Sequence, residues 1–481
     1  MMADKISKDQ MKVLIMGGGP AGLAAGKILT DFSAKCVVFE KDDGVGGLSR
    51  THSHNGFLFD LGGHRFFTKK NELDEFIKRL MVDELINVQR SSKIYFMHKY
   101  FEYPPTLLNA FVGLGPVISA EVLFSFLREK LRFNKKPVVT LEDWVVSQFG
   151  RKMFELFFKN YTEKVWGVPC SQASASWAGQ RIKGMSMLST IKEALIPSKK
   201  DSPVSLIPHF SYPAHGIGRI SERLKQEIEK KNEVRLNSRI SKIMHDGKQI
   251  TGLVIQTRDG KEYVEQGTNY LSSIPVTELI QNFDPPAPPE IIAATKKLRY
   301  RDLLIVVLMF DSERITNDTW IYIPDPNIEF GRLHEPTNWS ATMSPPGKTS
   351  LVFEYFCFET DKIWSLPDQQ LADRTASQFA AIKLAPGAEK KVIDSCVVRA
   401  RKAYPMHELG VDPAVELIKH YIRQFSNLML MGRYGMFLYN NLDHSMETGI
   451  RAAQNLLGAN YDLEDVLKKD EYLEIKYPEN E

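Results

Sequence analysis

Cysteine is scarce in this sequence, with four residues among 481: Cys36, Cys170, Cys357 and Cys396. Their wide spacing fits neither a disulfide framework nor a metal-binding pattern, so we expect no metal site and four thiols in the core. A reducing cytoplasm is the compartment that suits such thiols. Charge of one sign is also lacking, because 62 basic against 59 acidic residues leave a net charge of +3. This balance gives no indication of nucleic-acid binding.

A long uninterrupted apolar segment is missing as well. The most apolar run, Leu107 to Leu127, contains Asn109, Gly115-Pro116 and Glu121. It therefore predicts buried helices rather than a membrane span, and a peripheral contact with a membrane stays open. The polar start, Met1 to Gln10, predicts no secretory signal. We interpret the basic residues that follow the apolar run as a solvated helix end; they are Arg128, Lys130, Arg132, Lys135 and Lys136.

A glycine-rich turn is the most informative stretch that the sequence does contain. Four apolar residues, Val13 to Met16, predict a buried parallel strand, and Gly17-Gly18-Gly19-Pro20-Ala21-Gly22 leads from it into a helix of small residues. Gly17 permits a tight turn, Gly19 lets backbone approach a pyrophosphate, and Gly22 lets helix and strand pack closely. The helix N-terminus then offers free N–H groups to phosphates.

A second strand, Cys36 to Phe39, ends at Glu40, which is placed to accept a hydrogen bond from a ribose hydroxyl. Strand, turn, helix, strand and terminal acid in this order predict a dinucleotide site. The segment Gly44 to Thr51 then brings another glycine pair beside Arg50, where backbone can approach a flat ring system near a cation. With Phe57 to His64, this arrangement resembles the superfamily of amine oxidases, protoporphyrinogen oxidases and UDP-galactopyranose mutases. The resemblance implies FAD.

The rest of the chain predicts an α/β fold, with a Rossmann-like FAD-binding domain and helical and mixed-sheet insertions on the substrate side. We expect a helix over Asn71 to Leu85, another beginning at Thr140 with Asp143 in its cap, and a last one over Met446 to Leu457. The expected units are FAD-binding parts at 1–100, 206–284 and 425–481, a helical insertion at 101–205, and a mixed-sheet substrate domain at 285–424.

Five further segments resemble UDP-galactopyranose mutases, in particular those of the eukaryotic type. They are Gly62-Gly63-His64; Lys164-Val165-Trp166 with Trp177 to Arg181; Trp320 to Tyr322 with Phe330-Gly331-Arg332; Tyr404-Pro405; and Gly432 to Gly435 with Tyr439 and Asn441 to Ser445. The resemblance implies that His64, Arg181 and Arg332 are the catalytic residues. The two arginines would hold a diphosphate, since a guanidinium binds phosphate oxygens in pairs.

The resemblance also implies which residues bind each ligand. The residues implied at FAD are Gly17, Gly19, Pro20, Ala21, Gly22, Glu40, Lys41, Gly46, Gly47, Leu48, Arg50, Gly63, His64, Ile240, Gly432, Arg433, Asn441, Leu442 and Ser445. Arg90 and Ser92 fall where such enzymes contact NADPH, a possible reductant. The residues implied at the substrate are Tyr103, Thr162, Trp166, Arg181, Trp320, Tyr322, Arg332, Tyr404, Tyr439 and Asn441.

The implied reaction is a redox-neutral interconversion of pyranose and furanose forms of a nucleotide sugar, with N5 of reduced FAD as nucleophile at the anomeric carbon. Some residues depart from the mutase pattern. Pro105-Thr106 follow Tyr103-Pro104 where the family has an aromatic and an amide residue, and Thr162 and Leu442 replace an asparagine and a glutamine. The base and the sugar therefore stay open. Two alternatives remain: an FAD-dependent oxidoreductase acting on an apolar substrate, and an inactive flavoprotein that serves as an assembly module.

Overall fold

The computed structural model describes residues 11–103, 107–132, 137–175 and 209–468. Several residues singled out from the sequence lie outside these ranges. They are the segment Trp177 to Arg181, with the predicted catalytic Arg181, the residues Pro104 to Thr106 after Tyr103, and the pair Lys135-Lys136.

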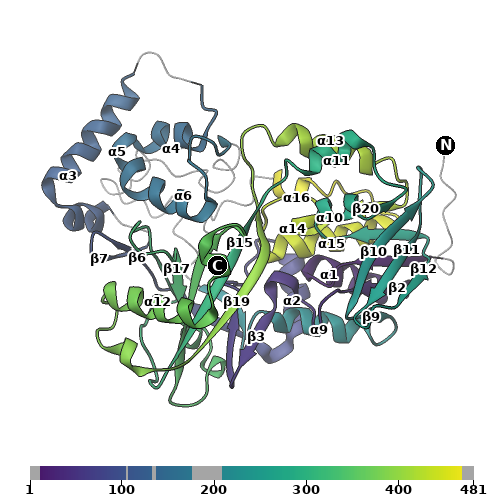
Figure 1. The fold of residues 1–481 in the computed structure, drawn as a ribbon, viewed down its shortest axis with the longest axis horizontal. Helices are drawn as coiled ribbons and strands as arrows, with labels where there is room; N and C mark the ends of the chain where they lie inside the picture. The colour runs from purple at the N-terminus through teal and green to yellow at the C-terminus, as the bar shows by residue number, and fades with distance from the viewer. Residues whose placement is uncertain (1–10, 104–106, 133–136, 176–208, 469–481) are drawn as a thin grey trace, which may run out of the picture.

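A five-stranded parallel sheet forms the right-hand side of the molecule in Figure 1, with strand order β20-β13-β1-β2-β9. Its strands are β1 (Lys12–Met16), β2 (Lys35–Phe39), β9 (Glu233–Arg235), β13 (Asn269–Ser272) and β20 (Leu428–Leu430). Helix α1 (Pro20–Asp31) connects β1 to β2, and α9 (Gly218–Ile228) and α15 (Leu442–Leu456) pack beside it. This arrangement confirms the predicted α/β, Rossmann-like fold.

Side chains alternate across β1, as they must in a strand with two covered faces. Val13 and Ile15 join the core beneath the helices, whereas Leu14 and Met16 join a core on the opposite side. That side is covered by a four-stranded sheet of order β12-β11-β10-β14 and three helices. These elements are β10 (Ser238–His245), β11 (Ile250–Thr257), β12 (Glu262–Glu265), β14 (Phe283–Asp284), α10 (Val276–Gln281), α11 (Pro289–Thr295) and α13 (Asp412–Ile422).

A seven-stranded mixed sheet lies at the lower left in Figure 1, in the order β19-β15-β18-β17-β16-β6-β7. Its strands are β6 (Ser92–Phe96), β7 (Lys99–Glu102), β15 (Tyr300–Phe310), β16 (Trp320–Tyr322), β17 (Arg332–His334), β18 (Thr349–Cys357) and β19 (Val392–Pro405). Every residue of β15 and β18 is buried, and α12 (Asp368–Ala381) packs against this sheet. Because β6 and β7 belong here, the sheet joins the first hundred residues to the later substrate-side segment.

A group of helices occupies the upper left of Figure 1: α3 (Leu107–Lys130), α4 (Leu141–Phe149), α5 (Arg151–Met153) and α6 (Asn160–Trp166). The predicted start of α4 is confirmed, because the Thr140 hydroxyl accepts from the N–H of Asp143 at 3.0 Å and the Asp143 carboxylate accepts from the N–H of Thr140 at 3.0 Å. Short elements complete the fold: β3 (Thr51–His54), β4 (Phe57–Asp60), α14 (Gly432–Gly435) and α16 (Asp465–Lys468).

Two helix boundaries differ from the sequence-based expectation. Helix α2 spans Asn71–Met81 rather than reaching Leu85, because Leu85 begins β5 (Leu85–Gln89), which pairs with the distant β8 (His209–Pro213). Helix α15 begins at Leu442, four residues before the predicted start. There the N–H of Asn441 donates to Nδ1 of His444 at 3.1 Å, so this histidine stabilises the first turn.

Two expectations about burial were wrong. Cys36, Cys170 and Cys357 are buried, but Cys396 is only partly buried at the margin of a core cluster, because β19 is the edge strand of its sheet. Helix α3 is broken at Gly115 as its sequence indicates, yet one of its sides is exposed rather than buried. In the part of the chain that the structure describes, no helix combines the length and apolar character needed to cross a bilayer. The same residues contain no group of histidine, cysteine and carboxylate side chains suited to a metal ion.

Candidate active site

The glycine turn after β1 has the geometry that its sequence requires. Gly17 has a φ of +105°, and a Cβ there would lie 2.5 Å from Oγ of Ser273. A Cβ at Gly22 would collide with the carbonyl oxygen of Gly17, so the close approach of α1 to β1 depends on glycine. Gly19 differs from both, because a Cβ there would meet nothing within 4 Å. The turn is therefore packed tightly at Gly17 and Gly22 and open at Gly19.

The acidic end of β2 and the second glycine pair meet this turn. Oε2 of Glu40 accepts from the N–H of Gly18 at 2.8 Å, and burial raises the pKa of Glu40 although hydrogen bonds from backbone oppose that rise. The N–H of Gly46 donates to the carbonyl of Gly18 at 2.9 Å, and Gly47 lies close to Gly19. The other predicted FAD residues of this region differ in their surroundings. Arg50 forms an ion pair with Asp43 at 2.7 Å, and Lys41 is exposed. Leu48 packs on a core cluster, and Ile240 is buried in β10.

These residues fit a bound dinucleotide. Helix α1 has Pro20 in its first turn and no side chain capping its N-terminus, which leaves the N–H groups of Ala21 and Gly22 for a phosphate. The open space at Gly19 lies at the same place, so backbone and helix dipole both face an anion there. Glu40 lies beside the turn, with a carboxylate that can accept from a ribose hydroxyl as well as from Gly18.

The C-terminal segment packs directly onto α1. A Cβ at Gly449 of α15 would collide with the carbonyl oxygen of Ala21, and one at Gly432 would lie 2.9 Å from Cβ of Ala21. The Arg433 guanidinium donates to the carbonyls of Asn440 at 3.1 Å and Ala403 at 3.0 Å, which ties the last segment to β19. Three predicted cofactor residues lie around the start of α15: exposed Asn441, buried Leu442, and Ser445, whose hydroxyl donates to the Asn440 amide oxygen at 2.7 Å.

Three side chains of the substrate-side sheet lie in one row across neighbouring strands. Tyr322 of β16 is in register with Arg332 of β17, and Arg332 is in register with Glu354 of β18. Nε of Arg332 donates to Oε1 of Glu354 at 2.7 Å, and Nη2 of Arg332 donates to Oε2. The Glu354 side chain has no exposed surface, whereas that of Arg332 retains 23%. Arg332 thus reaches from a buried carboxylate toward open space.

The charges of this pair balance each other. Burial alone would raise the pKa of Glu354. The positive charge of the Arg332 guanidinium lowers it by more, so the pKa of Glu354 lies below its ordinary value. Burial would lower the pKa of Arg332, and Glu354 raises it. Both members of the pair are therefore ionised, and Glu354 compensates the positive charge of Arg332. The sequence alone does not reveal this compensation.

His64 and His334 flank the pair. Burial, followed by the positive charge of Arg433, lowers the pKa of His64 to about 3, and burial lowers the pKa of His334 to about 4. Both rings are therefore neutral at pH 7. Nδ1 of His64 has no hydrogen-bond partner among the described residues. Next to His64, a Cβ at Gly63 would lie 3.6 Å from the ring of Trp339. His64 and Arg332 lie in one cluster, since the charge of Arg332 acts on the pKa of His64.

Aromatic residues line the remaining sides of this cluster. Tyr404 and Tyr439 stack with ring centroids 5.8 Å apart, and Trp166 meets both rings edge-on. Tyr322 contacts Tyr161 at 5.5 Å. Burial raises the pKa of Tyr404 to about 12, so its hydroxyl remains a donor at neutral pH. The predicted residues Trp166, Tyr322, Arg332, Tyr404 and Tyr439 are thus one contiguous group, whereas Thr162 is a half-buried residue of α6 for which no such contact is present in the described part.

The predicted NADPH residues lie next to this group. Nε of Arg90 donates to Oγ of Ser92 at 3.0 Å, and the Arg90 guanidinium lies 4.9 Å from the ring centroid of Trp320 and 5.6 Å from that of Tyr103. Such cation–π contacts attract the guanidinium to the faces of both rings. Tyr103 in turn contacts Tyr322 at 5.0 Å, which links this corner to the Arg332 row.

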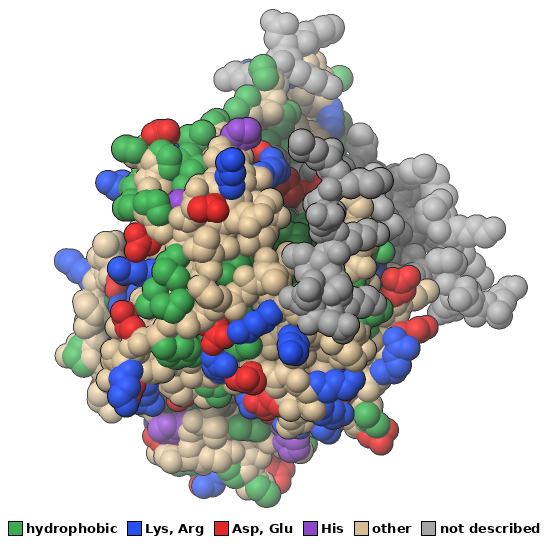
Figure 2. Space-filling view, turned by 90° about the vertical axis from the view of Figure 1, so that its right-hand side faces the viewer, with side chains coloured by type: hydrophobic (Ala, Val, Ile, Leu, Met, Phe, Trp, Pro, Cys, Tyr) green, Lys and Arg blue, Asp and Glu red, His purple; other side chains and the backbone are tan. Residues whose placement is uncertain are grey.

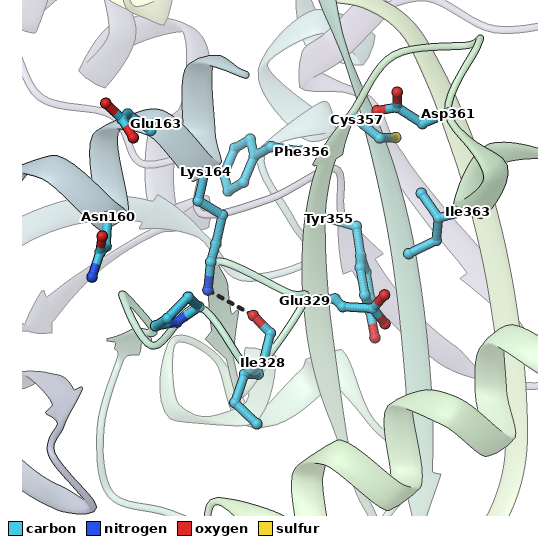
Figure 3. Close-up of a pocket in the computed structure, with 11 residues that line it drawn as sticks. Asn160, Glu163, Lys164, Ile328, Glu329, Tyr355, Phe356, Cys357, Asp361 and Ile363 are labelled. Carbon is cyan, nitrogen blue, oxygen red and sulfur yellow. Dashed lines mark hydrogen bonds between the residues drawn. The ribbon is translucent and has the colours of Figure 1, made fainter. Parts of the chain in front are cut away.

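Lys164 holds the loop between β16 and β17 (Figure 3). Its ammonium donates to the backbone carbonyls of Ile323 at 2.7 Å, Asp325 at 2.6 Å and Ile328 at 2.7 Å, and more weakly to that of Phe330 at 3.5 Å. Figure 3 shows the bond to Ile328. Burial lowers the pKa of Lys164 to about 8. The same side chain lines a pocket of about 390 Å³ between α6 and β18, together with Glu329 and Phe356. Because Arg332 follows this loop directly, Lys164 positions the strand that carries the guanidinium.

Sequence reasoning missed Glu354, His334, Tyr161 and the role of Lys164. A signal for Glu354 was present, since it is the one charged residue in the apolar run Leu351 to Cys357, and a buried carboxylate needs a cationic partner. His334 lies two residues after Arg332 and so on the same side of β17. The carbonyl partners of Lys164 had no signal, because they are backbone atoms about 160 residues away: the separations are 159, 161 and 164 residues.

Taken together, a parallel sheet, an open glycine turn at a helix N-terminus and an acidic strand end define a protein that binds a dinucleotide. The sequence pattern of the flavin containing amine oxidoreductases matches residues 20–457, most of the chain. The protein belongs to this family, and the match supports FAD as its cofactor.

Individual relatives share the fold but differ in activity. A 1-hydroxycarotenoid 3,4-desaturase from Flavobacterium sp. (strain P99-3) is 24% identical over 265 residues, which are 51% of this chain and 54% of the desaturase. The match thus spans about half the length of that relative. A solved reduced UDP-galactopyranose mutase aligns with a TM-score of 0.81 and 23% identity, over 95% of this chain and 96% of the mutase. A putrescine oxidase with bound putrescine aligns with a TM-score of 0.64 and 14% identity, over 94% and 99% of the two chains.

Proposed function

We propose that this protein is a flavin-dependent nucleotide-sugar mutase that interconverts pyranose and furanose forms, and that Arg332 binds the diphosphate of its substrate. The observation that carries the proposal is the group of guanidinium and phenol donors around Arg332. Tyr322 neighbours it across the strands, and Tyr161 and Tyr404 are close enough to influence its pKa. Guanidinium groups and phenols together suit phosphate oxygens, and an apolar substrate has no need of them.

Arg332 has a donor left for such a substrate. Its hydrogen bonds within the described residues use Nε and Nη2, so Nη1 remains for a phosphate oxygen. When the diphosphate leaves the sugar, negative charge grows on its oxygens, and a fixed guanidinium stabilises that charge without reorganising. Arg181 would be the second such group. The hydroxyl groups of Tyr404 and Tyr439 would donate hydrogen bonds to the same oxygens.

The remaining residues would bind and orient the cofactor. The turn from Gly17 to Gly22 would hold the pyrophosphate, Glu40 a ribose, and the start of α15 the flavin side. Bound reduced FAD would supply the nucleophile for the anomeric carbon. His64, neutral at pH 7, would donate or accept one hydrogen bond beside the ring. NADPH at Arg90 and Ser92 is the proposed reductant, and the cytoplasm the proposed compartment.

A second candidate function is an oxidoreductase that removes hydride from an apolar substrate. Its support comes from the desaturase relative and from the Arg332–Glu354 pair. Because Glu354 compensates the charge of Arg332, the pair attracts a diphosphate less strongly than an unpaired arginine would.

The redox state that each function needs separates the two. The purified protein, reduced with dithionite without oxygen, is incubated with a panel of nucleotide sugars, and the products are separated by chromatography. We expect a furanose or pyranose isomer to form only with reduced protein and without net consumption of electrons. The mutase proposal fails if no nucleotide sugar isomerises. If a substrate also reduces the oxidised flavin, seen as loss of its absorbance, and peroxide forms in air, the protein is an oxidoreductase.

Arg332→Ala is the variant that tests the site itself. We expect it to lose about 2–5 kcal/mol of binding or transition-state stabilisation, as for the removal of one partner of a buried charge pair. The matched control is Arg374→Ala, because Arg374 forms a similar pair with Glu329 at the surface, with 52% of its side chain exposed. Near-wild-type turnover of Arg332→Ala with bound flavin would exclude Arg332 from the reaction.

A further inference from the structure

Exposed apolar side chains concentrate on the outer side of α3. Val117 is 70% exposed, Phe124 69%, Leu127 47% and Leu131 75%. Single exposed apolar residues are ordinary on a protein surface, but three of these on α3 and a fourth, Leu131, directly after its end form an unusual concentration. Val138 and Val139, just before α4, are exposed as well.

The four residues form one continuous stripe. They are separated by seven, three and four positions, which is the spacing of side chains that lie above one another along a helix. Exposed Ala120 lies in the same stripe. On the other side of the helix, Val122 and Phe126 are buried in a core that they share with α4. Helix α3 is therefore apolar on two sides, and only the inner side packs into that core.

Basic residues border the stripe at the end of the helix. Between 128 and 132 the chain carries Arg128, Lys130 and Arg132 against the single acid Glu129, and both arginines are exposed. Glu121, the other acidic residue of this helix, pairs with Lys152 of α5. The charge next to the last three residues of the stripe is thus positive.

The position of α3 leaves this side open to a large partner. Figure 1 shows the helix at the outer edge of the molecule, at the end opposite the parallel sheet. Figure 2 shows the face of the molecule turned away from α3, where Lys and Arg side chains alternate with Asp and Glu and no single charge dominates. On α3, by contrast, an apolar stripe lies directly beside exposed basic residues.

We propose that the outer side of α3 binds the surface of a membrane that contains anionic lipids. Phe124, Leu127 and Leu131 would enter the boundary between headgroups and acyl chains, while Arg128 and Arg132 contact lipid phosphates. A second copy of the chain fits this surface less well. In a two-fold dimer with parallel helices, Arg128 and Arg132 would meet their own copies. With antiparallel helices they would face the start of the other copy's stripe, where the acidic Glu121 already pairs with Lys152. The proposal does not depend on which reaction the site catalyses.

The test is co-sedimentation of the flavin-loaded protein with lipid vesicles. We expect binding to vesicles of phosphatidylcholine mixed with phosphatidylglycerol, much weaker binding to phosphatidylcholine alone, and loss of binding at high salt because the charges are screened. Phe124→Ser with Leu127→Ser should weaken binding by at least about tenfold, since each removes several buried CH₂ equivalents. Arg128→Gln with Arg132→Gln should reduce the preference for the anionic vesicles.

The matched control changes exposed apolar residues elsewhere, Val264→Ser with Ile393→Ser, which should bind as the unchanged protein does. Thermal unfolding and flavin absorbance check that every variant folds. Absence of sedimentation with anionic vesicles overturns the proposal. The proposal also fails if the double variant Phe124→Ser with Leu127→Ser binds anionic vesicles as tightly as the unchanged protein. A dimer in light scattering that this double variant abolishes, without vesicle binding by the unchanged protein, assigns the surface to a second copy instead.

Discussion

Replacing Glu354 with glutamine separates the two roles of the Arg332 pair, because it should change protein stability and anion binding in opposite directions. Glutamine keeps the shape of the side chain and one acceptor for Nε of Arg332, but it removes the negative charge and places an N–H₂ group near Nη2. The fold then loses a compensated pair, while the guanidinium gains net charge toward a ligand.

The magnitude of each effect follows from the burial of the pair. Removal of one partner of a buried salt bridge costs about 3–5 kcal/mol. Since the Arg332 side chain keeps 23% of its exposure and glutamine retains one hydrogen bond, we expect about 2–3 kcal/mol less free energy of unfolding. For binding, a unit charge about 5 Å away at an effective dielectric constant of about 20 is worth roughly 3 kcal/mol. Part of that is screened, so we expect UDP to bind roughly tenfold more tightly to Glu354→Gln.

Urea unfolding measures the first effect, and titration of the flavin-loaded protein with UDP by calorimetry measures the second. Arg332→Gln should lower both stability and UDP affinity. Glu329→Gln is the matched control, because Glu329 pairs with Arg374 at the surface, where a salt bridge is worth about 0–1 kcal/mol. If folded Glu354→Gln binds UDP more weakly, in parallel with Arg332→Gln, the carboxylate orients the guanidinium rather than compensating it, and our reasoning about its charge is wrong.

Three more predictions concern single positions. Lys164→Ala should lower the midpoint of thermal unfolding. Ammonium chloride should restore part of the lost stability, because NH₄⁺ can bind the carbonyl oxygens that the lysine contacts. An equal effect of sodium chloride would contradict this explanation. For His334, the folded pKa of about 4 lies below the ordinary 6.5, so its contribution to stability is present above pH 6.5 and is lost as the pH falls toward 4. His334→Gln should therefore flatten the urea-derived free energy of unfolding over that interval by up to about 3 kcal/mol, and an unchanged pH dependence would contradict the assignment. Gly19→Ala should leave apoprotein stability nearly unchanged but reduce retained flavin absorbance, whereas Gly22→Ala should lower both; equal flavin retention in Gly19→Ala would exclude Gly19 from the phosphate site.

The sequence determined the features that depend on residues close together in the chain. The order of β1, the glycine turn, α1, β2 and Glu40 could be predicted because tight turns and close helix packing require glycine at particular positions. The cap of α4 could be predicted for the same reason, since Thr140 and Asp143 satisfy each other's backbone N–H groups within one turn. Each of these signals is local, so it needs no knowledge of how distant strands pair.

Only the tertiary structure decided the chemistry around Arg332. The register of β17 against β18 places it opposite Glu354, 22 residues away, and the register of β16 places Tyr322 on its other side. A shift of one residue would have turned the guanidinium to the other face of the sheet. The same holds for the strand at Leu85 and for the outer side of α3, because pairing and burial depend on which distant surfaces meet. Residue types and short spacings are written in the sequence, whereas strand register and exposure are properties of the closed fold.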